Sequence, residues 1–335
     1  MSESHLAHIV THKHQLDLRF EILRWTREYF WLNGFTEIET PLLLRLPGQE
    51  PYLSPMRVTL HNETGKEYLG YLHTSPEYTM KKMLAAGYTK IFSLGKVFRD
   101  YESFGGTHNP EFTMIEWYQA NADMYTIMDD VEGLLQYLAK AISKHQDTHT
   151  NVITPSRSHM RELWSEYANI NLDLNLTQET LYKTLKQRGL NVTPDEPYED
   201  LFYRIFLNEI EPHLGKNGPQ IVHHYPHPMA ALSKHSTVDI GYAERFEVYW
   251  NGMELGNAFS ELTDPVEQKN RLVEEQKQRK KAGKDVYDID QEFTDALEHM
   301  PPSGGIAMGI DRIVSCLTSC QKIDDMLVLP ASLLF

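Results

Sequence analysis

The segment spanning residues 98–118 brings together an arginine, aromatic rings and a carboxylate, which are groups that bind a charged ligand. If residues 112–118 form a strand, alternate side chains share one face, and that face carries Phe112, Met114, Glu116 and Tyr118. Arg99 suits a phosphate, a flat aromatic ring suits a nucleotide base, and a carboxylate suits an ammonium group. A half-exposed strand with a surface ion pair would contain the same residues, so both interpretations stay open for this segment alone.

Two further acidic residues flank a short turn. Asn251-Gly252 is the strongest short hairpin signal in the chain, and a two-residue turn there places Glu247, Tyr249 and Glu254 on one face. Two carboxylates so close together repel each other unless a cation lies between them. The pattern therefore predicts a site for Mg²⁺ that carries ATP phosphates.

Three more candidate ligand-binding residues, Asn257, Phe259 and Glu261, follow along the same strand. Each of them is an odd number of residues away from Glu254, so a regular strand would point their side chains to the other side of the sheet. They reach the same site only if a β-bulge intervenes, and we expect that bulge at Gly256.

Residues 304–312 form a glycine-rich strand followed by an arginine. Gly305, Ala307 and Gly309 are small residues at a period of two, which gives a flat floor that a ligand can approach closely. Arg312 would lie just inside the following helix and point back to that floor. Glycines in a strand more often indicate close packing than a ligand site, and that alternative stays open.

Helices and strands alternate around these segments in an order typical of an α+β domain with many antiparallel strands. Apolar residues from Leu18 to Leu32 recur at helical spacing, and a second helix is expected over residues 76–86. Expected strands cover residues 35–39, 57–60, 68–72, 91–99, 112–118, 220–225 and 242–250. A helix over residues 125–144 is followed by a polar stretch, 145–158, that suits a surface linker, and the helical middle region covers about residues 155–215. The charged run 267–284 is interpreted as a solvated helix face.

The bulk properties indicate a soluble globular protein, and we expect one catalytic domain over residues 1–335. No apolar run approaches the roughly 18 residues that a membrane span needs, so a cytoplasmic location and no membrane partner are expected. The net charge of −15 argues weakly against broad contact with nucleic acid. Cys316 and Cys320 have the spacing of neighbours on one helix face, not of a disulfide framework.

Histidines form two groups that are candidate metal ligands. One group lies near the N-terminus and contains His5, His8, His12 and His14. The other contains His223, His224 and His227. Solvated histidines without a metal are the commoner explanation for both groups.

Taken together, these segments resemble the three motifs of the class II aminoacyl-tRNA synthetases. Residues 34–41 resemble motif 1, residues 98–118 motif 2 and residues 304–312 motif 3. Pro76-Glu77, the run from His108 to Met114 and the run from Glu254 to Glu261 resemble the lysyl branch in particular. The resemblance implies the class II catalytic fold, an antiparallel sheet flanked by helices, together with a homodimer that forms through motif 1.

The resemblance also implies roles for individual residues. Arg99 and Arg312 would be the catalytic residues, because they hold the ATP phosphates. The other ATP-binding residues would be Glu102, His108, Asn109, Phe112, Glu247 and Gly309. Glu247 and Glu254 would bind Mg²⁺. The amino acid would be held by Ser75, Glu77, Glu116, Tyr118, Asn257, Phe259, Glu261 and Ala307. Three carboxylates in one pocket demand a doubly cationic substrate such as lysine or β-lysine, since unpaired buried charges are costly.

Motif 1 begins within the first few dozen residues, which leaves no room for the N-terminal anticodon-binding domain of lysyl-tRNA synthetases. Short lysyl-like chains resemble the ligases that attach (R)-β-lysine to elongation factor P, and Ser75 and Ala307 also resemble that group. We therefore expect elongation factor P as the acceptor and no tRNA partner. Two alternatives stay open: an enzyme that charges tRNA with help in trans, and an inactive paralogue that binds lysine for regulation.

The sequence departs from motif 2 at one point. The family pattern places an acidic residue two positions after the arginine, whereas here Asp100 follows Arg99 directly and Glu102 lies three positions on. The loop that leads to His108 is also one residue longer than expected. The sequence therefore leaves open whether Asp100 or Glu102 takes the acidic role.

Overall fold

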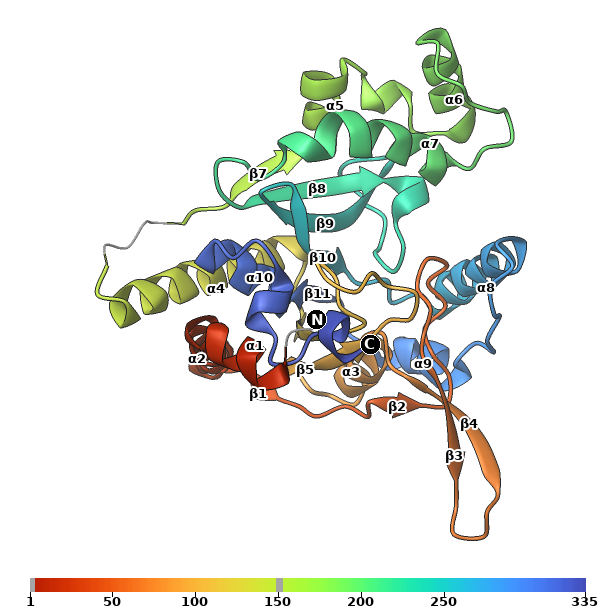
Figure 1. Cartoon of the computed structure of the whole chain (residues 1–335). Coiled ribbons are helices and arrows are strands. Elements are labelled where there is room, and N and C mark those ends of the chain that lie inside the picture. The colour runs from red at the N-terminus through yellow and green to blue at the C-terminus, as the bar shows by residue number, and fades with distance from the viewer. Residues whose placement is uncertain (1–3, 149–152) are drawn as a thin grey trace.

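The computed structural model describes residues 4–148 and 153–335, and within them eight strands form one mixed sheet in the order β1-β5-β6-β11-β10-β9-β8-β7. The strands are β1 (Thr36–Glu37), β5 (Lys90–Phe98), β6 (Glu111–Ala120), β11 (Ser303–Gly309), β10 (Met253–Ser260), β9 (Tyr242–Trp250), β8 (Gln220–Pro226) and β7 (Ser156–His159). Only the two edge pairs, β1 with β5 and β7 with β8, are parallel. The predicted α+β class is confirmed (Figure 1).

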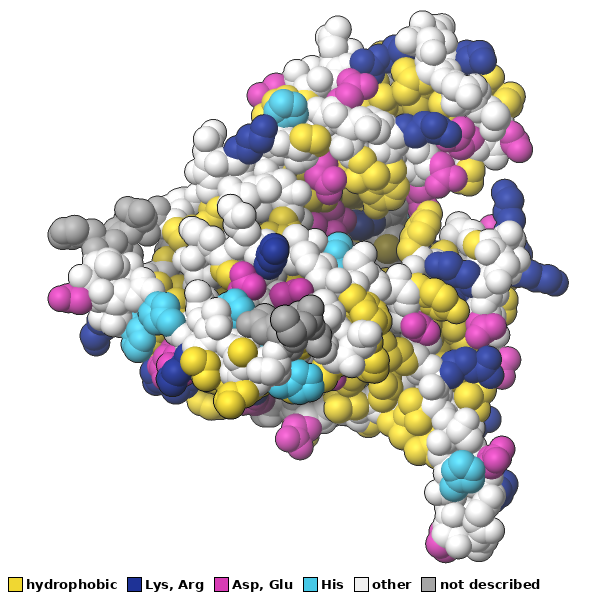
Figure 2. All heavy atoms as spheres, viewed as in Figure 1, with side chains coloured by type: hydrophobic (Ala, Val, Ile, Leu, Met, Phe, Trp, Pro, Cys, Tyr) yellow, Lys and Arg dark blue, Asp and Glu magenta, His cyan; other side chains and the backbone are white. Residues whose placement is uncertain are grey.

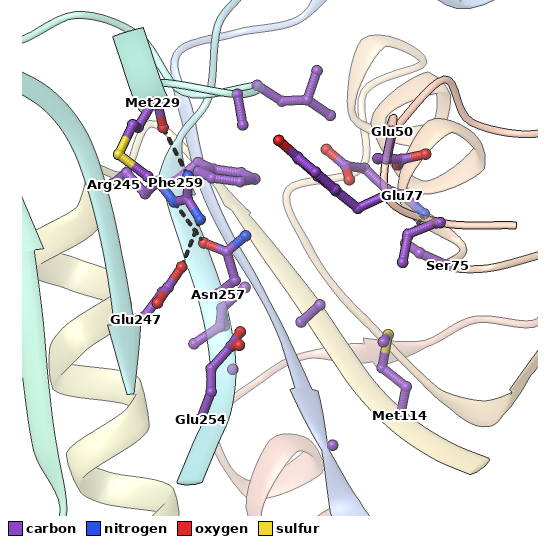
Figure 3. A pocket seen from close by; sticks show the side chains of 18 of the residues that line it. Glu50, Ser75, Glu77, Met114, Met229, Arg245, Glu247, Glu254, Asn257 and Phe259 are labelled. Carbon is purple, nitrogen blue, oxygen red and sulfur yellow. Dashed lines mark hydrogen bonds and ion pairs between the residues drawn. The ribbon is translucent and has the colours of Figure 1, made fainter. Parts of the chain in front are cut away.

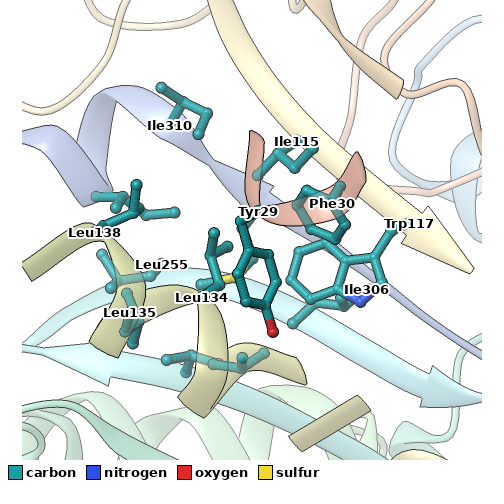
Figure 4. Close-up of a cluster of buried hydrophobic side chains, with 14 of the residues drawn as sticks. Tyr29, Phe30, Ile115, Trp117, Leu134, Leu135, Leu138, Leu255, Ile306 and Ile310 are labelled. Carbon is teal, nitrogen blue, oxygen red and sulfur yellow. The ribbon is translucent and has the colours of Figure 1, made fainter. Parts of the chain in front are cut away.

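One face of this sheet is covered by α2 (Lys13–Leu32), α4 (Met124–His145) and α10 (Ile310–Thr318), and together they enclose the largest apolar core. Phe30, Trp117 and Ile306 meet in that core, as Figure 4 shows. The predicted helix over residues 18–32 is confirmed, but Leu32 is wrongly placed on its buried face. Its side chain is 75% exposed, although Tyr29 and Phe30 in the same turn are buried.

A buried polar network fixes α2 and α10 to β6. Arg19 of α2 forms an ion pair of 2.7 Å with Asp311 of α10 and donates a hydrogen bond to the Thr113 hydroxyl. Asp311 in turn accepts the backbone N–H of Thr113. These charges are paired and hydrogen-bonded, as buried charges must be, so they hold the start of α10 in a fixed position relative to β6.

The opposite face of the sheet carries α3 (Glu77–Ala85), α8 (Pro265–Lys281) and α9 (Gln291–Ala296), which share a second core. The predicted helix at residues 76–86 is confirmed, with Pro76 as its N-cap and Gly87 in the left-handed conformation after its end. A separate three-stranded sheet contains β2 (Leu43–Leu44), β4 (Glu67–Leu72) and β3 (Arg57–His61). The strands expected at 57–60 and 68–72 are present and form the β3–β4 hairpin, which projects away from the body of the protein (Figure 1).

The middle of the chain packs on the far edge of the main sheet. Its helices are α5 (Met160–Ala168), α6 (Gln178–Gln187) and α7 (Tyr198–Ile205), and their apolar side chains form a third core with Tyr225 and Tyr249. The predicted linker at 145–158 is only partly correct, since β7 begins at Ser156; residues 149–152 lie outside the described part of the chain.

Two short helices, α1 (His5–Thr11) and α11 (Ala331–Leu334), lie near the two ends of the chain. The prediction that Cys316 and Cys320 share a helix is wrong: α10 ends at Thr318, and Ser319 adopts a left-handed conformation that turns the chain before Cys320. Both cysteines are free thiols. Among the helices of the described residues, none combines the length and the hydropathy required to cross a bilayer.

The two features predicted for residues 247–261 are both present. Asn251 and Gly252 have positive φ angles and join β9 to β10 in a two-residue turn. The pairing then shifts between Glu254, opposite Tyr249, and Gly256, opposite Val248, so Leu255 is the extra residue of a β-bulge. Because of this bulge, Asn257 is opposite Glu247 and faces the same side as Glu254.

Candidate active site

The sheet face opposite the largest core carries a cavity of about 810 Å³. Strands β6, β9, β10 and β11 form its floor, and its walls come from the loop after β2, the start of α3, the motif 2 loop and α8. The space-filling view shows the surface hollowed between the helical middle region and α8, with acidic side chains inside the hollow (Figure 2). A volume of this size accommodates a nucleotide together with a small molecule.

Fifteen of the seventeen site residues predicted from the sequence line this cavity. They are Ser75, Glu77, Arg99, Glu102, His108, Asn109, Phe112, Tyr118, Glu247, Glu254, Asn257, Phe259, Ala307, Gly309 and Arg312. Glu116 and Glu261 do not line it but lie directly behind its wall, 1% and 2% exposed. Close to the floor, Glu254 and Asn257 extend from β10 on one side while Glu50, Ser75 and Glu77 lie on the other (Figure 3).

The two arginines at one end of the cavity form no ion pair with any carboxylate of the described residues. The guanidinium carbon of Arg99 lies 5.0 Å from the centre of the Phe112 ring, and its buried Nε has no hydrogen-bond partner within residues 4–148 and 153–335. Arg312 donates to the backbone carbonyl of Glu254 at 2.7 Å. Burial lowers the pKa of Arg99, but an arginine remains protonated, so two positive charges face the cavity.

His108 lines the cavity beside Arg312. Its Nε2 is 3.1 Å from Nη2 of Arg312. Burial and the neighbouring Arg312 lower the pKa of His108, which keeps the imidazole neutral and lets Nε2 accept the arginine N–H. Asn109 serves a structural purpose, because its amide donates to the Glu111 carbonyl and accepts the backbone N–H of Ala331. It therefore anchors α11 beside the cavity.

The loop of motif 2 places Glu102, not Asp100, at the cavity. Asp100 is exposed, and its carboxylate caps the backbone N–H of Tyr101, which has a positive φ of 61°. Of the two acidic residues between which the sequence does not decide, only Glu102 has access to a ligand in the cavity.

A lysine of the chain itself holds two of the predicted substrate carboxylates. Nζ of Lys81 is 2.5 Å from Glu77 and 2.6 Å from Glu261, and Lys81 is only 1% exposed. Burial lowers the pKa of Lys81, but Glu261 and Glu77 outweigh it and raise the pKa above its ordinary value. With Glu116 next to them, the group contains three carboxyl groups and one ammonium, so it carries an excess of two negative charges when all three carboxyl groups are ionised.

Glu116 is held by two hydroxyl donors, Ser75 at 2.9 Å and Tyr118 at 2.8 Å. Burial and the proximity of Glu77 raise the pKa of Glu116. Oε1 of Glu261 is buried, and it has no hydrogen-bond partner in the part of the chain that the structure describes. A doubly cationic ligand would donate a hydrogen bond to this Glu261 oxygen, and its positive charges would compensate the excess negative charge of the carboxylates.

Arg245 lies on β9 in the floor of the cavity, although no sequence motif singles it out. It donates to Glu247 at 2.5 Å, to Asn257 at 3.1 Å and to the carbonyl of Met229 at 2.7 Å (Figure 3). Its position two residues before Glu247, on the same strand face, is the signal by which the sequence could have identified it.

Glu247 is therefore more constrained than the sequence indicates. Besides Arg245, its carboxylate accepts the hydroxyls of Tyr225 and Tyr249. Glu254 differs: burial and the charge of Glu247 raise the pKa of Glu254 to about 7. A divalent cation at Glu254 would relieve this repulsion, and Glu247 keeps one acceptor position on Oε1.

The interpretation of residues 267–284 as a solvated helix face is wrong for one side of α8. Arg271, Glu274, Glu275 and Gln278 line the cavity. Burial and the nearby Glu50 and Glu77 raise the pKa of Glu275 to about 8. Arg279 is buried and donates to the carbonyls of Glu50 and Leu53 at 2.7 and 2.9 Å, so it ties the loop after β2 to α8.

Gly305 is the most tightly packed point of the glycine-rich floor. A Cβ atom at this position would lie 2.2 Å from the Tyr118 ring and 2.8 Å from Oε1 of Glu261. We expect Gly305→Ala to lower the free energy of unfolding by about 1–3 kcal/mol and to displace Tyr118 from Glu116. Gly95→Ala in β5, where a Cβ meets nothing within 4 Å, is the matched control for a thermal melt. Equal melting temperatures for the two variants would contradict this packing.

Comparison with known proteins gives one family and a consistent group of relatives. The family described as tRNA synthetases class II (D, K and N) matches residues 6–333. A protein of Hamiltonella defensa named elongation factor P–(R)-β-lysine ligase is 36% identical, with 93% of each chain covered. Proteins of the same name from Yersinia enterocolitica and Haemophilus influenzae are each 35% identical, with 93% and 92% of each chain covered.

Proposed function

Because the chain belongs to the class II tRNA synthetases of the D, K and N type, in the branch of the elongation factor P–(R)-β-lysine ligases, we propose that it activates (R)-β-lysine or lysine with ATP and transfers it to a lysine of elongation factor P. One observation carries the activation step: Arg99 and Arg312 face the cavity without a carboxylate partner among the described residues. Unpaired buried charge is costly, so an anionic ligand such as a polyphosphate is expected between them.

In the first step the substrate carboxylate attacks the α-phosphorus of ATP, an aminoacyl-adenylate forms and pyrophosphate leaves. Negative charge grows on the phosphoryl oxygens in the transition state, and Arg99 and Arg312 stabilise it. Phe112, held against Arg99, offers its other face to the adenine ring. At the other end, Glu116, Glu261 and Glu77 receive the two amines of the substrate.

In the second step the acceptor amine attacks the adenylate carbonyl, an amide forms and AMP leaves. A free lysine amine has a pKa near 10.4, so the acceptor must lose a proton before it attacks. The acceptor enters from the open side of the cavity, where the exposed acidic side chains lie. Since the acceptor is a translation factor, the reaction belongs in the cytoplasm.

Glu254 and Glu247 are the residues that would hold Mg²⁺. Bound there, the ion would neutralise phosphate charge and orient the polyphosphate. The surroundings of Glu254 support this assignment: it lies partly buried beside a second carboxylate, and burial together with the charge of Glu247 raises its pKa.

This assignment predicts a pH-dependent requirement for magnesium. A protonated Glu254 does not bind Mg²⁺, and at pH 6 a group of pKa about 7 is about nine-tenths protonated. We expect the Mg²⁺ concentration for half-maximal activity to rise about tenfold from pH 8 to pH 6. In Glu254→Gln the Mg²⁺ concentration for half-maximal activity should be high at both pH 6 and pH 8. A half-maximal concentration that is the same at pH 6 and pH 8 in the unchanged protein would contradict the assignment.

We also propose a homodimer that buries the outward side of α2. Phe20, Trp31 and Leu32 are half or more exposed there, and an exposed apolar group of this size favours a protein partner. Sedimentation equilibrium of the unchanged protein and of Trp31→Glu tests this proposal. A dimer that the substitution converts to a monomer supports it, whereas a monomer in both rejects it.

ATP–pyrophosphate exchange tests the proposed activation. The purified protein is assayed with (R)-β-lysine, with L-lysine and without an amino acid. Exchange that depends on one of the two amino acids is expected, since the reaction runs backward only when an adenylate forms. Exchange with neither amino acid would reject the enzyme and favour a regulatory protein that binds lysine.

A further inference from the structure

A group of three histidines lies away from the cavity, where the helical middle region meets the main sheet. The sequence predicts a possible metal group of His223, His224 and His227, and the structure divides it. His227 lies at the cavity with its ring against His235, 3.1 Å between centroids. His159, the N-cap of α5, joins His223 and His224 instead.

The ring nitrogens of these three residues converge. One nitrogen from each lies within 4.8 Å of the others, and Nδ1 of His223 is 2.7 Å from Nδ1 of His224. The rings of His159 and His224 are stacked with centroids 4.7 Å apart. His223 and His159 are half-buried, and His224 is buried.

We propose that His159, His223 and His224 form a binding site for a divalent transition-metal ion of the Zn²⁺ type. Imidazole nitrogens are preferred ligands of zinc, copper and nickel, and three histidines with an open fourth position are a known zinc arrangement. None of the three histidines lines the cavity. His159 is the N-cap of α5 and the other two lie on β8, so an ion bound to all three would join α5 to the sheet.

The backbone supports a built site. His224 has a positive φ of 60°, which is unusual for a residue with a side chain, and the pairing of β8 with β9 shifts at the same place. This bulge directs two consecutive side chains, His223 and His224, to the same point, whereas a regular strand would direct them to opposite faces. Strained backbone of this kind concentrates at functional sites.

The charges around the three rings do not oppose a cation. The nearby cations are compensated, since Arg157 is paired with Asp129 and Glu132 and Arg161 with Asp239.

Binding requires a small rearrangement. Both nitrogens of His159 have partners: Nδ1 accepts the backbone N–H of Arg161, and Nε2 is 2.8 Å from Asp239. One of these bonds must be exchanged for the bond to the metal, and Asp239, which also pairs with Arg161, remains beside the ion. The 2.7 Å contact between His223 and His224 must widen to about 3.3 Å, the spacing of tetrahedral ligands around zinc.

Isothermal titration calorimetry of the metal-free full chain with ZnCl₂ tests the proposal. Two variants remove a ring while they keep the local backbone: His159→Asn, because asparagine is also a good N-cap, and His224→Asn, because asparagine tolerates a positive φ. The control is the double variant His5→Ala/His14→Ala, which removes two exposed histidines elsewhere. Thermal melts without metal confirm that each variant is folded.

We expect both asparagine variants to bind one zinc equivalent fewer than the unchanged protein, and the control to keep that equivalent. Co²⁺ in the same site should give the intense visible absorption of a tetrahedral complex, which is absent in His159→Asn. The proposal would be overturned if either asparagine variant still bound this zinc equivalent or if the control lost it. It would also be overturned if the unchanged protein bound no zinc.

Discussion

Replacing Arg99 with alanine is expected to lower the rate of ATP–pyrophosphate exchange by about 10²- to 10³-fold, the usual cost of removing one preorganised charge from a transition state. Arg99 has no ion-pair partner among the described residues, and its Nε is buried without a hydrogen bond. Apart from the contact of its guanidinium with the Phe112 ring, its charge therefore forms no ion pair that would stabilise the fold. We expect the variant to melt at the same temperature as the unchanged protein or above it, because a buried unpaired charge is destabilising.

Two further variants sharpen this prediction. Arg99→Lys keeps the charge but loses the planar fork that binds two phosphate oxygens, so activity should recover only in part. Arg188→Ala removes an arginine of the helical middle region that pairs with Glu209 at 3.1 Å, and exchange should not change. If Arg99→Ala retained full exchange, or lost it only because it unfolds, Arg99 would not bind the phosphates.

Replacing Lys81 with methionine is expected to lower the free energy of unfolding by about 3–5 kcal/mol at pH 8, since it leaves buried carboxylates without their cation. Lys81 lies 2.5 Å from Glu77 and 2.6 Å from Glu261. The double variant Lys81→Met/Glu261→Gln should regain part of the loss, because only one of the two carboxylates then remains charged. Urea unfolding at constant pH measures the free energy of unfolding of the unchanged protein, the single variant and the double variant.

The free energy of unfolding that Lys81→Met loses should be smaller at pH 6 than at pH 8. Burial raises the pKa of Glu261 to about 7 even with Lys81 present, and removal of Lys81 raises that pKa further. A carboxyl with a raised folded-state pKa binds more protons than the unfolded chain between the two pKa values, so stability falls as pH rises through that window. Lys81 itself has a raised pKa, and its contribution is lost only as pH rises through that value, far above pH 8.

Lys82→Met is the matched control, because it removes the neighbouring lysine of the same helix. Lys82 is partly exposed and pairs with Asp290 at 2.6 Å, so its loss should cost less than about 1 kcal/mol and show little dependence on pH. Equal losses for Lys81→Met and Lys82→Met would contradict the role of Lys81 as the internal counter-ion of the site.

Several parts of the site follow from periodicity in the sequence. Alternation along residues 112–118 correctly separates Phe112, at the cavity, from Ile115 and Trp117, in the core. Asn251-Gly252 fixes the register of β9 and β10 because few residues other than asparagine and glycine adopt its two positive φ angles. The bulge next to Gly256 is predictable too, since without it Asn257 would face away from Glu247.

Other parts depend on contacts between distant segments, which periodicity does not show. Lys81 is an ordinary helix residue until α3 packs against β10 and brings Glu261 to it. Arg279 belongs to a charged run that favours a solvated helix, yet it binds carbonyls more than 220 positions away, at Glu50 and Leu53. His159 joins His223 and His224 only because β7 and β8 are parallel neighbours.

The most direct test of the proposed function is acceptor transfer. The protein is incubated with ATP, Mg²⁺ and radiolabelled (R)-β-lysine or L-lysine, together with either elongation factor P or tRNA, and the label in each acceptor is measured. We predict label on elongation factor P, stable as expected for an amide, and none on tRNA. Label on tRNA alone would contradict the proposal and would make the protein a tRNA-charging enzyme.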